Sequence, residues 1–382
     1  MKILLLSQIA MVDYKYTFSL ANALKSYGND VELVIDDKKD NGYCKCKCYN
    51  QFLTSRKDIG KIKKLINYCL SYRFIVKKVL LEKFDIIHVQ WFQVSPVDYY
   101  YLHKLSRNGI KIVVSVHDIL PFNKKFYDYF YHKKIYSICS KIIVQAPNNI
   151  ERFSKLFPIY SNKLAFIPHG HFLDFAELHN QKVARQHLGI PENKFVLLFF
   201  GQIKKVKGIG ILLEAFGKLV SKREDLFLVL AGNVWKDDFG PYQEIIDRYG
   251  LSEKNLKKDI RFIPDEEVEY YYSSCDITVL PYLDVYQSGI VQLSYAYGKT
   301  TIATRLPPLM EIVEDEKTGF LCMPNDVDDL ANTIIRAVEH KESLSVMGLR
   351  GKKKISEKYS WSDIAEKVNN LYLDVIYEKC RR

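Results

Sequence analysis

The stretch DITVLPYLDVYQSGIVQLSYAYGKTTIATR, which runs from Asp276 to Arg305, decides the fold that we expect for the whole chain. Its apolar run at 277–280 predicts a buried strand, residues 290–297 predict a helix, and residues 300–304 predict a second strand. A strand, a helix and a second strand in this order form a parallel crossover unit. The stretch therefore predicts an α/β fold with ligands bound at the carboxyl ends of its strands.

The helix of this unit follows a turn formed by Gln287, Ser288 and Gly289, and its first apolar residue is Ile290. Backbone N–H groups at a helix start favour an anion, and a glycine lets the backbone approach it closely. An ordinary helix cap is the alternative interpretation, because Ser and Gly favour helix starts in any case. Both interpretations stay open on this stretch alone.

Length and composition indicate a two-domain globular protein. A chain of 382 residues exceeds what one core usually organises, and its apolar runs are too short for a membrane span or a signal peptide. The eight cysteines follow no disulfide-scaffold spacing, which favours a reducing cytoplasm. Alternation of Cys44, Cys46 and Cys48 would place three thiols on one face of a strand, but we expect no metal there because partner ligands are missing.

The positive charge of the chain is confined to its first half. Residues 1–180 hold 27 Lys and Arg against 15 Asp and Glu, whereas the remainder holds 29 against 30. The stretch 56–83 has apolar residues at helical spacing (Ile59, Ile62, Leu65, Ile66 and Leu70) among lysines, and the stretch 122–136 interleaves aromatic residues with lysines. We expect these stretches to meet an anionic membrane surface. The alternatives are an apolar face packed on the sheet with solvated lysines, or nucleic acid, for which no binding motif is present.

In the first half, strand patterns recur at 86–90, 112–116, 142–145 and 164–167, which indicates an open, mostly parallel sheet. The turn after the first strand lacks the Gly-x-Gly-x-x-Gly fingerprint, which argues against a nicotinamide-dependent dehydrogenase. His117 and Asp118 directly follow the strand 112–116, at the edge where ligands bind. They are candidate catalytic residues, although a strand-end histidine often has only a structural role.

In the second half, the polar stretch 174–186 is predicted to be a linker, and a strand at 195–200 opens a second α/β series that includes a strand at 260–263. The sequence GQIKKVKG at 201–208 places a glycine and three lysines directly before a helix. Such a loop can hold an anion through backbone donors and an ammonium group. Lys207, next to the helix start, is the candidate phosphate partner, and a solvated loop is the alternative.

Taken together, these residues resemble glycosyltransferase family 4 of the GT-B fold. The resemblance rests on GQIKKVKG, AGN at 231–233, DITVLPY, QSG, YGKTTIAT and EKTGFL, and it covers most of residues 190–340. It implies two Rossmann-like, doubly wound parallel-sheet domains that face each other across a cleft. The expected N-terminal domain, residues 1–175, binds the acceptor and faces the membrane. The expected C-terminal domain, residues 176–361, binds the donor. Residues 362–382 are expected to form a helix that returns to the first domain.

The resemblance also implies an activity. The implied enzyme is a hexosyltransferase that moves a hexose from a nucleotide-sugar donor to a saccharide or lipid-linked oligosaccharide. The reaction would retain the anomeric configuration and need no metal or cofactor. Its setting would be polysaccharide, capsule or lipopolysaccharide biosynthesis. The protein would be cytoplasmic and would bind peripherally at the inner face of the cell membrane. It would not bind nucleic acid. A non-catalytic sugar-nucleotide-binding subunit and a sugar-nucleotide epimerase are the alternatives. The donor base, the sugar, the acceptor, the linkage and the oligomeric state cannot be read from the sequence.

By position, the resemblance assigns the donor to Gly201, Gln202, Lys207, Ser288, Gly289 and Ile290, and it places His117 near the transferred sugar. The chain departs from the family in two respects. Gln202 stands where the family usually has Arg, and the usual pair of glutamates falls near Val285 and near Leu293. Asp284, next to Val285, is the candidate substitute for one carboxylate.

Overall fold

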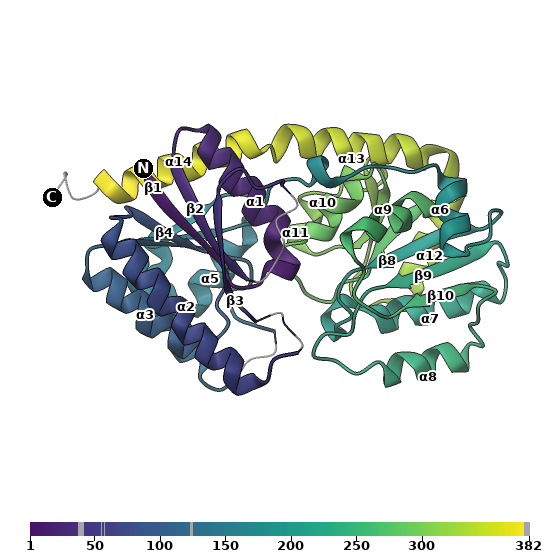
Figure 1. Cartoon of the computed structure of the whole chain (residues 1–382). Helices are drawn as coiled ribbons and strands as arrows, with labels where there is room; N and C mark the ends of the chain where they lie inside the picture. Colours follow the sequence, from purple (N-terminus) through teal and green to yellow (C-terminus); the bar gives the residue numbers. More distant parts are fainter. Residues whose placement is uncertain (37–41, 55, 57, 123–124, 378–382) are drawn as a thin grey trace. The chain divides into compact units, whose positions relative to one another are not determined.

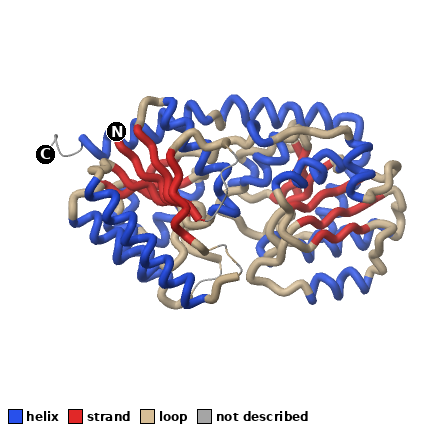
Figure 2. Tube along the Cα trace, viewed as in Figure 1, coloured by secondary structure: helices blue, strands red, loops and turns tan. Residues whose placement is uncertain are grey.

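The computed structural model describes residues 1–36, 42–54, 56, 58–122 and 125–377, and the chain divides into two compact units. The first unit comprises Met1–Gly170 and Tyr359–Arg382, and the second comprises His171–Lys358. Figure 2 shows a separate sheet, flanked by helices, in each unit. All strand pairs within both sheets are parallel, so the predicted class of two Rossmann-like α/β domains is confirmed.

The first unit is built on a seven-stranded sheet in the order β3-β2-β1-β4-β5-β6-β7. Its central strands are apolar and buried on both faces, as expected for parallel strands covered by helices. The strands are β1 (Lys2–Ser7), β2 (Asp30–Asp36), β3 (Lys47–Phe52), β4 (Ile86–Val89), β5 (Lys111–Val116), β6 (Lys141–Val144) and β7 (Leu164–Phe166). The helices, shown in Figure 1, are α1 (Ala10–Ser26), α2 (Lys61–Leu81), α3 (Ser95–Arg107), α4 (Asp128–Ile138), α5 (Asn148–Leu156) and α14 (Trp361–Tyr377).

The C-terminal helix α14 completes this unit by packing against α1 and the sheet. The hydroxyl of Tyr372 lies 2.6 Å from Nδ1 of His88, whose Nε2 lies 2.8 Å from Oγ of Ser115. Burial lowers the pKa of His88 to about 3, so this imidazole is neutral and bridges α14 to β5. At the start of α14, the ring of Trp361 leaves no room for a side chain at Gly170.

Helix α2 is held by a buried carboxylate on α3. The hydroxyls of Tyr68 and Tyr72 donate to Asp98 Oδ1 at 2.5 and 2.7 Å, and the backbone N–H of Val94 donates to Oδ2. Burial raises the pKa of Asp98 to about 7, although these donors favour its charged form. The Tyr72 hydroxyl also accepts from the side chain of Gln8, which links α2 to the turn after β1.

One expectation about the first unit was wrong. The strand β3 begins at Lys47, so Cys44 and Cys46 precede it and only Cys48 lies within it. The three thiols are therefore not aligned on one strand face. Among the described residues, no group of three or more His, Cys, Asp or Glu side chains is arranged to hold a metal ion.

The second unit is built on a six-stranded sheet in the order β10-β9-β8-β11-β12-β13. The predicted crossover forms as expected, with β11 pairing in parallel with β12 through the helix α10. The strands are β8 (Phe195–Phe200), β9 (Leu226–Ala231), β10 (Leu256–Asp259), β11 (Ile277–Leu280), β12 (Thr300–Thr304) and β13 (Gly319–Cys322). The helices are α6 (Gln181–Leu188), α7 (Ile209–Val220), α8 (Gly240–Arg248), α9 (Asp265–Ser274), α10 (Gly289–Ala296), α11 (Pro307–Met310), α12 (Val327–Glu339) and α13 (Leu344–Lys358).

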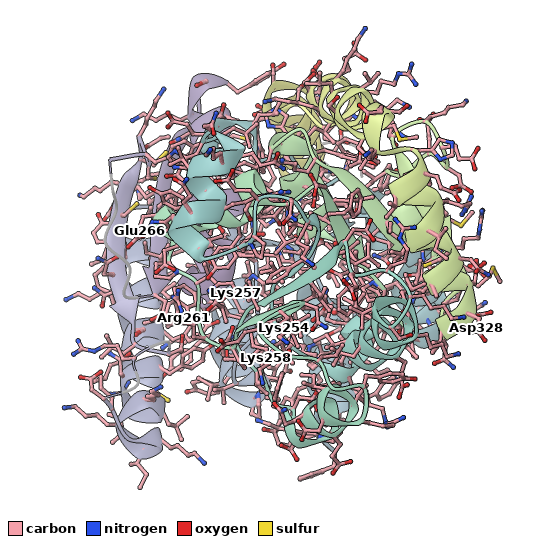
Figure 3. The ribbon with its side chains drawn as sticks, turned by 90° about the vertical axis from the view of Figure 1, so that its right-hand side faces the viewer. Lys254, Lys257, Lys258, Arg261, Glu266 and Asp328 are labelled. Carbon is pink, nitrogen blue, oxygen red and sulfur yellow. The ribbon has the colours of Figure 1, made fainter. Side chains whose placement is uncertain are left out.

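Two expectations about the second unit need correction. The strand predicted at 260–263 lies at Leu256–Asp259, on an edge of the sheet, where its lysines contradict an apolar pattern. Lysines are common on such edges because they discourage pairing with another chain. Figure 3 shows Lys254, Lys257, Lys258 and Arg261 around this strand. The stretch 174–186, predicted to be a linker, contains most of α6, whose start is capped by the side chain of Asn180.

Candidate functional site at the strand ends

The loops after β8 and β9 approach each other closely at the carboxyl edge of the second sheet. Gly232, after β9, has a φ of +151°, and a Cβ atom there would lie 1.8 Å from the carbonyl oxygen of Gly201. The backbone of Ile203 then pairs with Asn233 across the two loops. Only glycine fits at position 232, so the Gly201–Gln202 loop is fixed against the loop after β9.

The lysine loop is fixed by a second glycine. A short 3₁₀ turn (Lys205–Lys207) leads to Gly208, whose φ of +67° is left-handed and whose Cβ would lie 1.8 Å from the carbonyl oxygen of Pro281. This contact, together with a hydrogen bond from the N–H of Leu283 to the carbonyl of Val206, joins the loop to the end of β11. Lys207 is thereby placed directly at the start of α7.

The ammonium group of Lys207 lies over an aromatic ring from the neighbouring loop. Its Nζ atom is 3.7 Å from the centroid of the Tyr282 ring, a cation–π contact with a buried tyrosine. This contact holds a cation beside the N-terminus of α7, whose first N–H groups have no partner within the helix. A phosphate at this position would meet both an ammonium group and backbone donors.

The Gln-Ser-Gly turn lies at the same edge of the sheet. Ser288 is the extended residue before α10, and its side chain makes no capping hydrogen bond. The side-chain atoms Gln287 Oε1 and Ser288 Oγ are buried without a hydrogen-bond partner. The side chain of Ile290 lies beside the Gly201 loop: a Cβ atom added at Gly201 would be 3.4 Å from Cδ1 of Ile290. The structure thus brings Gly201, Lys207 and the 288–290 turn to one edge.

Asp284 and Leu293, at or beside the positions of the usual glutamates, have local roles. Asp284 Oδ1 accepts a hydrogen bond from the backbone N–H of Val285 at 2.7 Å. Leu293 lies in an apolar cluster with Tyr272 and Tyr297. Its neighbour Gln292 is buried, and both atoms of its amide lack a hydrogen-bond partner. Gln292 was missed by sequence reasoning, and the available signal was a polar residue inside an otherwise apolar helix.

In the first unit, His117 is enclosed by aromatic rings at the carboxyl end of β5. The ring of Trp91 lies parallel to it with centroids 4.5 Å apart, and Tyr16 contacts it edge-on at 5.2 Å. The Nε2 atom of His117 lies 3.1 Å from Oε1 of Gln90. Burial lowers its pKa well below the usual value, so the imidazole is neutral. Asp118 follows it, half-buried, in the same loop.

His117 belongs to a row of polar residues that directly follow neighbouring strands. Ser7 ends β1 and Gln8 follows it, Gln90 follows β4, and Gln145 follows β6. Several polar side-chain atoms of this row are buried and have no hydrogen-bond partner. They are Ser7 Oγ, Gln8 Oε1, Gln90 Nε2, Gln145 Oε1 and Gln145 Nε2. Native proteins satisfy nearly all buried polar groups, so an unsatisfied row indicates a place for water or ligand hydroxyls. Sequence reasoning missed the row because its members become neighbours only through strand order.

The apolar residues of the first half of α2 do not pack on the sheet. Ile62, Leu65, Ile66 and Leu70 are 78%, 47%, 56% and 52% exposed. The buried face of the helix is formed instead by Tyr68, Ser71, Tyr72, Ile75, Val76, Lys78 and Val79. Lys61 and Lys63 are exposed beside these apolar residues. The helix therefore presents apolar and basic side chains to solvent together.

The aromatic stretch before and within α4 has a similar exposed part. Phe126 is 98% exposed, and Phe130 and Tyr129 are about half exposed. Lys134 lies over the ring of Phe130, with its Nζ atom 4.4 Å from the centroid. No described helix has the length and apolar character needed to cross a bilayer. Residues 123–124 of the predicted basic stretch lie outside the described residues.

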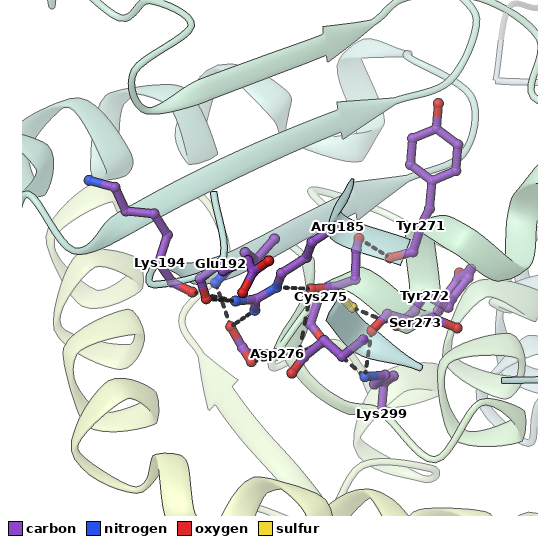
Figure 4. A network of polar contacts seen from close by, with 12 residues as sticks. Arg185, Glu192, Lys194, Tyr271, Tyr272, Ser273, Cys275, Asp276 and Lys299 are labelled. Carbon is purple, nitrogen blue, oxygen red and sulfur yellow. Dashed lines mark hydrogen bonds and ion pairs between the residues drawn. The ribbon is translucent and has the colours of Figure 1, made fainter. Parts of the chain in front are cut away.

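A cavity of 1020 Å³ lies in the second unit around the amino ends of β8, β11 and β12, opposite the edge described above. Figure 4 shows the polar network beside it, centred on Arg185 and Asp276. The guanidinium of Arg185 donates to the carbonyl of Ser274 and pairs with Asp276, and Lys299 donates to the carbonyl of Cys275. These cations satisfy carbonyls at the end of α9, which is a structural role.

Each unit matches one family model. Residues 180–354 match the model described as glycosyl transferases group 1, and residues 15–175 match Glycosyltransferase Family 4. The chain is 30% identical over 190 residues to an uncharacterized glycosyltransferase of Methanocaldococcus jannaschii, covering 49% of this chain and 47% of that protein. It is 28% identical over 239 residues to the lipopolysaccharide 1,2-N-acetylglucosaminetransferase of Salmonella typhimurium, covering 60% of each. These alignments therefore span about half to three fifths of the curated relatives.

Among solved structures, the fold is similar to that of Anabaena HepE in complex with UDP-glucose. The TM-score is 0.73 at 17% identity, and the superposition covers 97% of this chain and 99% of the other. At this identity the likeness concerns the fold alone. It agrees with the two parallel sheets described above.

Proposed function

We propose that this chain, whose second half matches the group 1 model and whose first half matches the family 4 model, is a GT-B glycosyltransferase that transfers a hexose from a nucleotide-sugar to a lipid-linked saccharide. The observation that carries the proposal is Lys207, held over Tyr282 at the start of α7. Its position favours the diphosphate of a nucleotide-sugar. The nucleotide-sugar bound by HepE and the lipopolysaccharide setting of the Salmonella relative support this choice.

The reaction breaks the bond between the anomeric carbon and the diphosphate, so negative charge grows on the leaving phosphate oxygens. Preorganised donors that face developing charge stabilise the transition state more than the ground state. Lys207 and the N–H groups at the starts of α7 and α10 are such donors. We infer that these groups, with the turn at 288–290, stabilise the leaving diphosphate without a metal, and that the anomeric configuration is retained, as the family resemblance implies.

The acceptor is proposed to bind at the carboxyl edge of the first sheet. There the amides of Gln90 and Gln145 hold unsatisfied donors and acceptors beside His117. Amides can pair with sugar hydroxyls as both donors and acceptors. His117, neutral in its aromatic enclosure, would then position a sugar through a hydrogen bond, and we propose Asp118, the other candidate catalytic residue, as the base. The atoms are covered in this conformation, so the loops after the strands must move to admit a sugar.

A lipid-linked acceptor requires the protein to reach a membrane. The exposed apolar residues of α2 can enter the headgroup region of a membrane. Lys61 and Lys63, which flank them, carry the charge that attracts anionic headgroups. We propose that this helix and the exposed aromatic residues around Phe126 place the protein at an anionic membrane surface, peripheral to it.

The proposal is tested by incubating the purified chain with UDP-, GDP- and dTDP-hexoses and a panel of synthetic lipid-linked saccharides. We expect nucleoside diphosphate release that depends on one acceptor, persists in EDTA, and yields a product with the anomeric configuration of the donor. In the same assay, Gln145→Ala should raise the KM for the acceptor and leave donor affinity unchanged. Conversion of the sugar-nucleotide without acceptor would instead identify an epimerase and contradict the proposal.

A further inference from the structure

Three thiols converge where the chain enters β3. The Sγ atom of Cys48 lies 3.4 Å from Sγ of Cys44, while the thiol of Cys46 points to α1 and donates to the carbonyl of Ala21 at 3.5 Å. A disulfide requires the two sulfur atoms to come within about 2 Å, so closure between Cys44 and Cys48 needs a movement of little more than 1 Å.

The environment of the pair favours reactivity. Hydrogen bonds from the thiols of Cys46 and Cys48, assisted by the nearby ammonium of Lys25, hold the pKa of Cys44 below its usual value. The thiolate is the reactive form of cysteine. Cys48 is half-buried rather than enclosed, which gives a small oxidant access to the pair. Buried thiols elsewhere differ, because burial raises the pKa of Cys139 and Cys275 to about 12.

The segment that carries the first thiol is held firmly on α1. The side chain of Asn22 donates to the carbonyl of Tyr43 at 2.9 Å and accepts from the N–H of Lys45 at 2.7 Å. The ammonium of Lys25 donates to the carbonyl of Lys45. These contacts keep the Cys44 backbone beside β3, so the two sulfur atoms are positioned to react before any oxidant arrives.

We propose that Cys44 and Cys48 are a modification site that hydroperoxides convert reversibly into an intramolecular disulfide. The Cys44 thiolate attacks a peroxide oxygen, breaks the O–O bond and becomes a sulfenic acid, and the hydroxide or alkoxide that is expelled takes a proton from solvent to leave as water or an alcohol. The Cys48 sulfur then attacks Cys44, forms the S–S bond and displaces hydroxide, which takes the Cys48 proton to leave as water. The peroxide gains two electrons, and a thiol reductant returns them by exchange.

The test uses the full chain treated with a small excess of hydrogen peroxide, followed by alkylation and peptide mass spectrometry. We expect a Cys44–Cys48 cross-link in the wild-type chain, with the mass lowered by the two thiol hydrogens, and its loss on treatment with dithiothreitol. The matched control Cys46→Ser keeps both reacting thiols and a hydroxyl for Ala21, so it should still form the link. Cys69→Ser removes a half-buried thiol on α2 and should also leave the link unchanged.

Cys44→Ser and Cys48→Ser should each abolish the link. In Cys48→Ser, which keeps the Cys44 thiol, the sulfenic acid should persist and be trapped by dimedone. The inference is overturned if both thiols of the folded wild-type chain remain alkylatable after peroxide, or if the link joins Cys46 instead. Circular dichroism of each variant separates loss of the link from loss of the fold. This site is independent of the proposed transfer reaction, so either claim can fail without the other.

Discussion

The Nζ atom of Lys207 lies 3.7 Å from the centre of the Tyr282 ring, and this pair joins the loop before α7 to the loop after β11. The ring face attracts the ammonium and holds it where a diphosphate would meet the helix start. Gly208 and Pro281, each next to one member of the pair, are in backbone contact. Contacts from two loops therefore position the lysine of the proposed donor site.

The ring, rather than the hydroxyl, should be the part of Tyr282 that matters for the donor. Tyr282→Phe keeps the ring and should leave nucleotide-sugar affinity within about twofold. Tyr282→Leu removes a contact that contributes roughly 0.5–2 kcal/mol, so affinity should fall by roughly 2- to 30-fold. Isothermal titration with the nucleotide-sugar that binds measures both. Equal affinities for the Phe and Leu variants would show that the ring does not position Lys207.

Gly208→Ala should disrupt the donor loop, because the new Cβ would lie 1.8 Å from the carbonyl oxygen of Pro281 in a left-handed conformation. We expect a lower melting temperature and loss of stabilisation by nucleotide-sugar. Gly210→Ala is the matched control: it lies in α7 with only ordinary contacts to Ile245 and Tyr242. Ala there should be neutral or stabilise by about 0.5–1 kcal/mol. Similar melting temperatures for the two variants would argue against the close approach.

The carboxyl group of Asp98 should make the stability of the first unit depend on pH. Its pKa is raised by burial from 3.8 to about 7, so the folded chain holds a proton that the unfolded chain releases. The stabilisation is complete below pH 4 and is lost as the pH rises to about 7. The free energy of unfolding of the wild-type chain, relative to Asp98→Asn, should fall over this range.

Denaturant titrations of both chains at several pH values measure this difference. Buried His88 and His169, whose pKa values are lowered, give the opposite trend, but they are present in both chains and cancel. A difference that stays constant from pH 4 to pH 7 would mean that Asp98 keeps its charge in the fold.

Membrane binding should require both kinds of exposed residue on α2. The chain should sediment with phosphatidylglycerol vesicles at low salt, and Lys61→Gln/Lys63→Gln should weaken this, since each lysine contributes about 1 kcal/mol. The variant Ile62→Gln/Ile66→Gln should bind the vesicles at low salt, because its lysines remain, but high salt should release it. At the same high salt, part of the wild-type chain should stay bound, because its apolar side chains insert into the membrane. Lys254→Gln/Lys258→Gln changes one exposed lysine before the edge strand β10 of the second unit and one exposed lysine within it (Figure 3). This charge-matched control should bind like wild type. Binding of the wild-type chain that is equal for neutral and anionic vesicles would contradict the role of the lysines.

The parts of the fold that the sequence predicts well are those with strong local patterns. The run at 277–280 and the helix start at Gly289 are as expected, because a buried parallel strand must be apolar throughout. The prediction failed at β10, Leu256–Asp259. One side of this edge strand faces solvent rather than another strand, so its residues need not be apolar. Local patterns report burial, so an exposed strand gives a weak signal.

The candidate sites show the same limit at longer range. Lys207 could be selected from its place before a helix, but its contact with Tyr282 links residues far apart in the sequence. The unsatisfied amides of Gln90 and Gln145 become a row only because β4, β5 and β6 are neighbours in the sheet. On α2 the spacing identified the apolar residues, yet a second face with Tyr68 and Tyr72 packs inward instead. Which face is buried depends on tertiary partners such as Asp98.

The most direct test of the central claim is thermal stabilisation of the full chain by a panel of UDP-, GDP- and dTDP-sugars, with NAD as a negative control. A ligand that binds only the folded state must raise the melting temperature. We predict a shift with at least one nucleotide-sugar that is retained in Lys205→Ala and lost or strongly reduced in Lys207→Ala. A shift of equal size in Lys207→Ala, or no shift with any nucleotide-sugar, would contradict the proposed donor site.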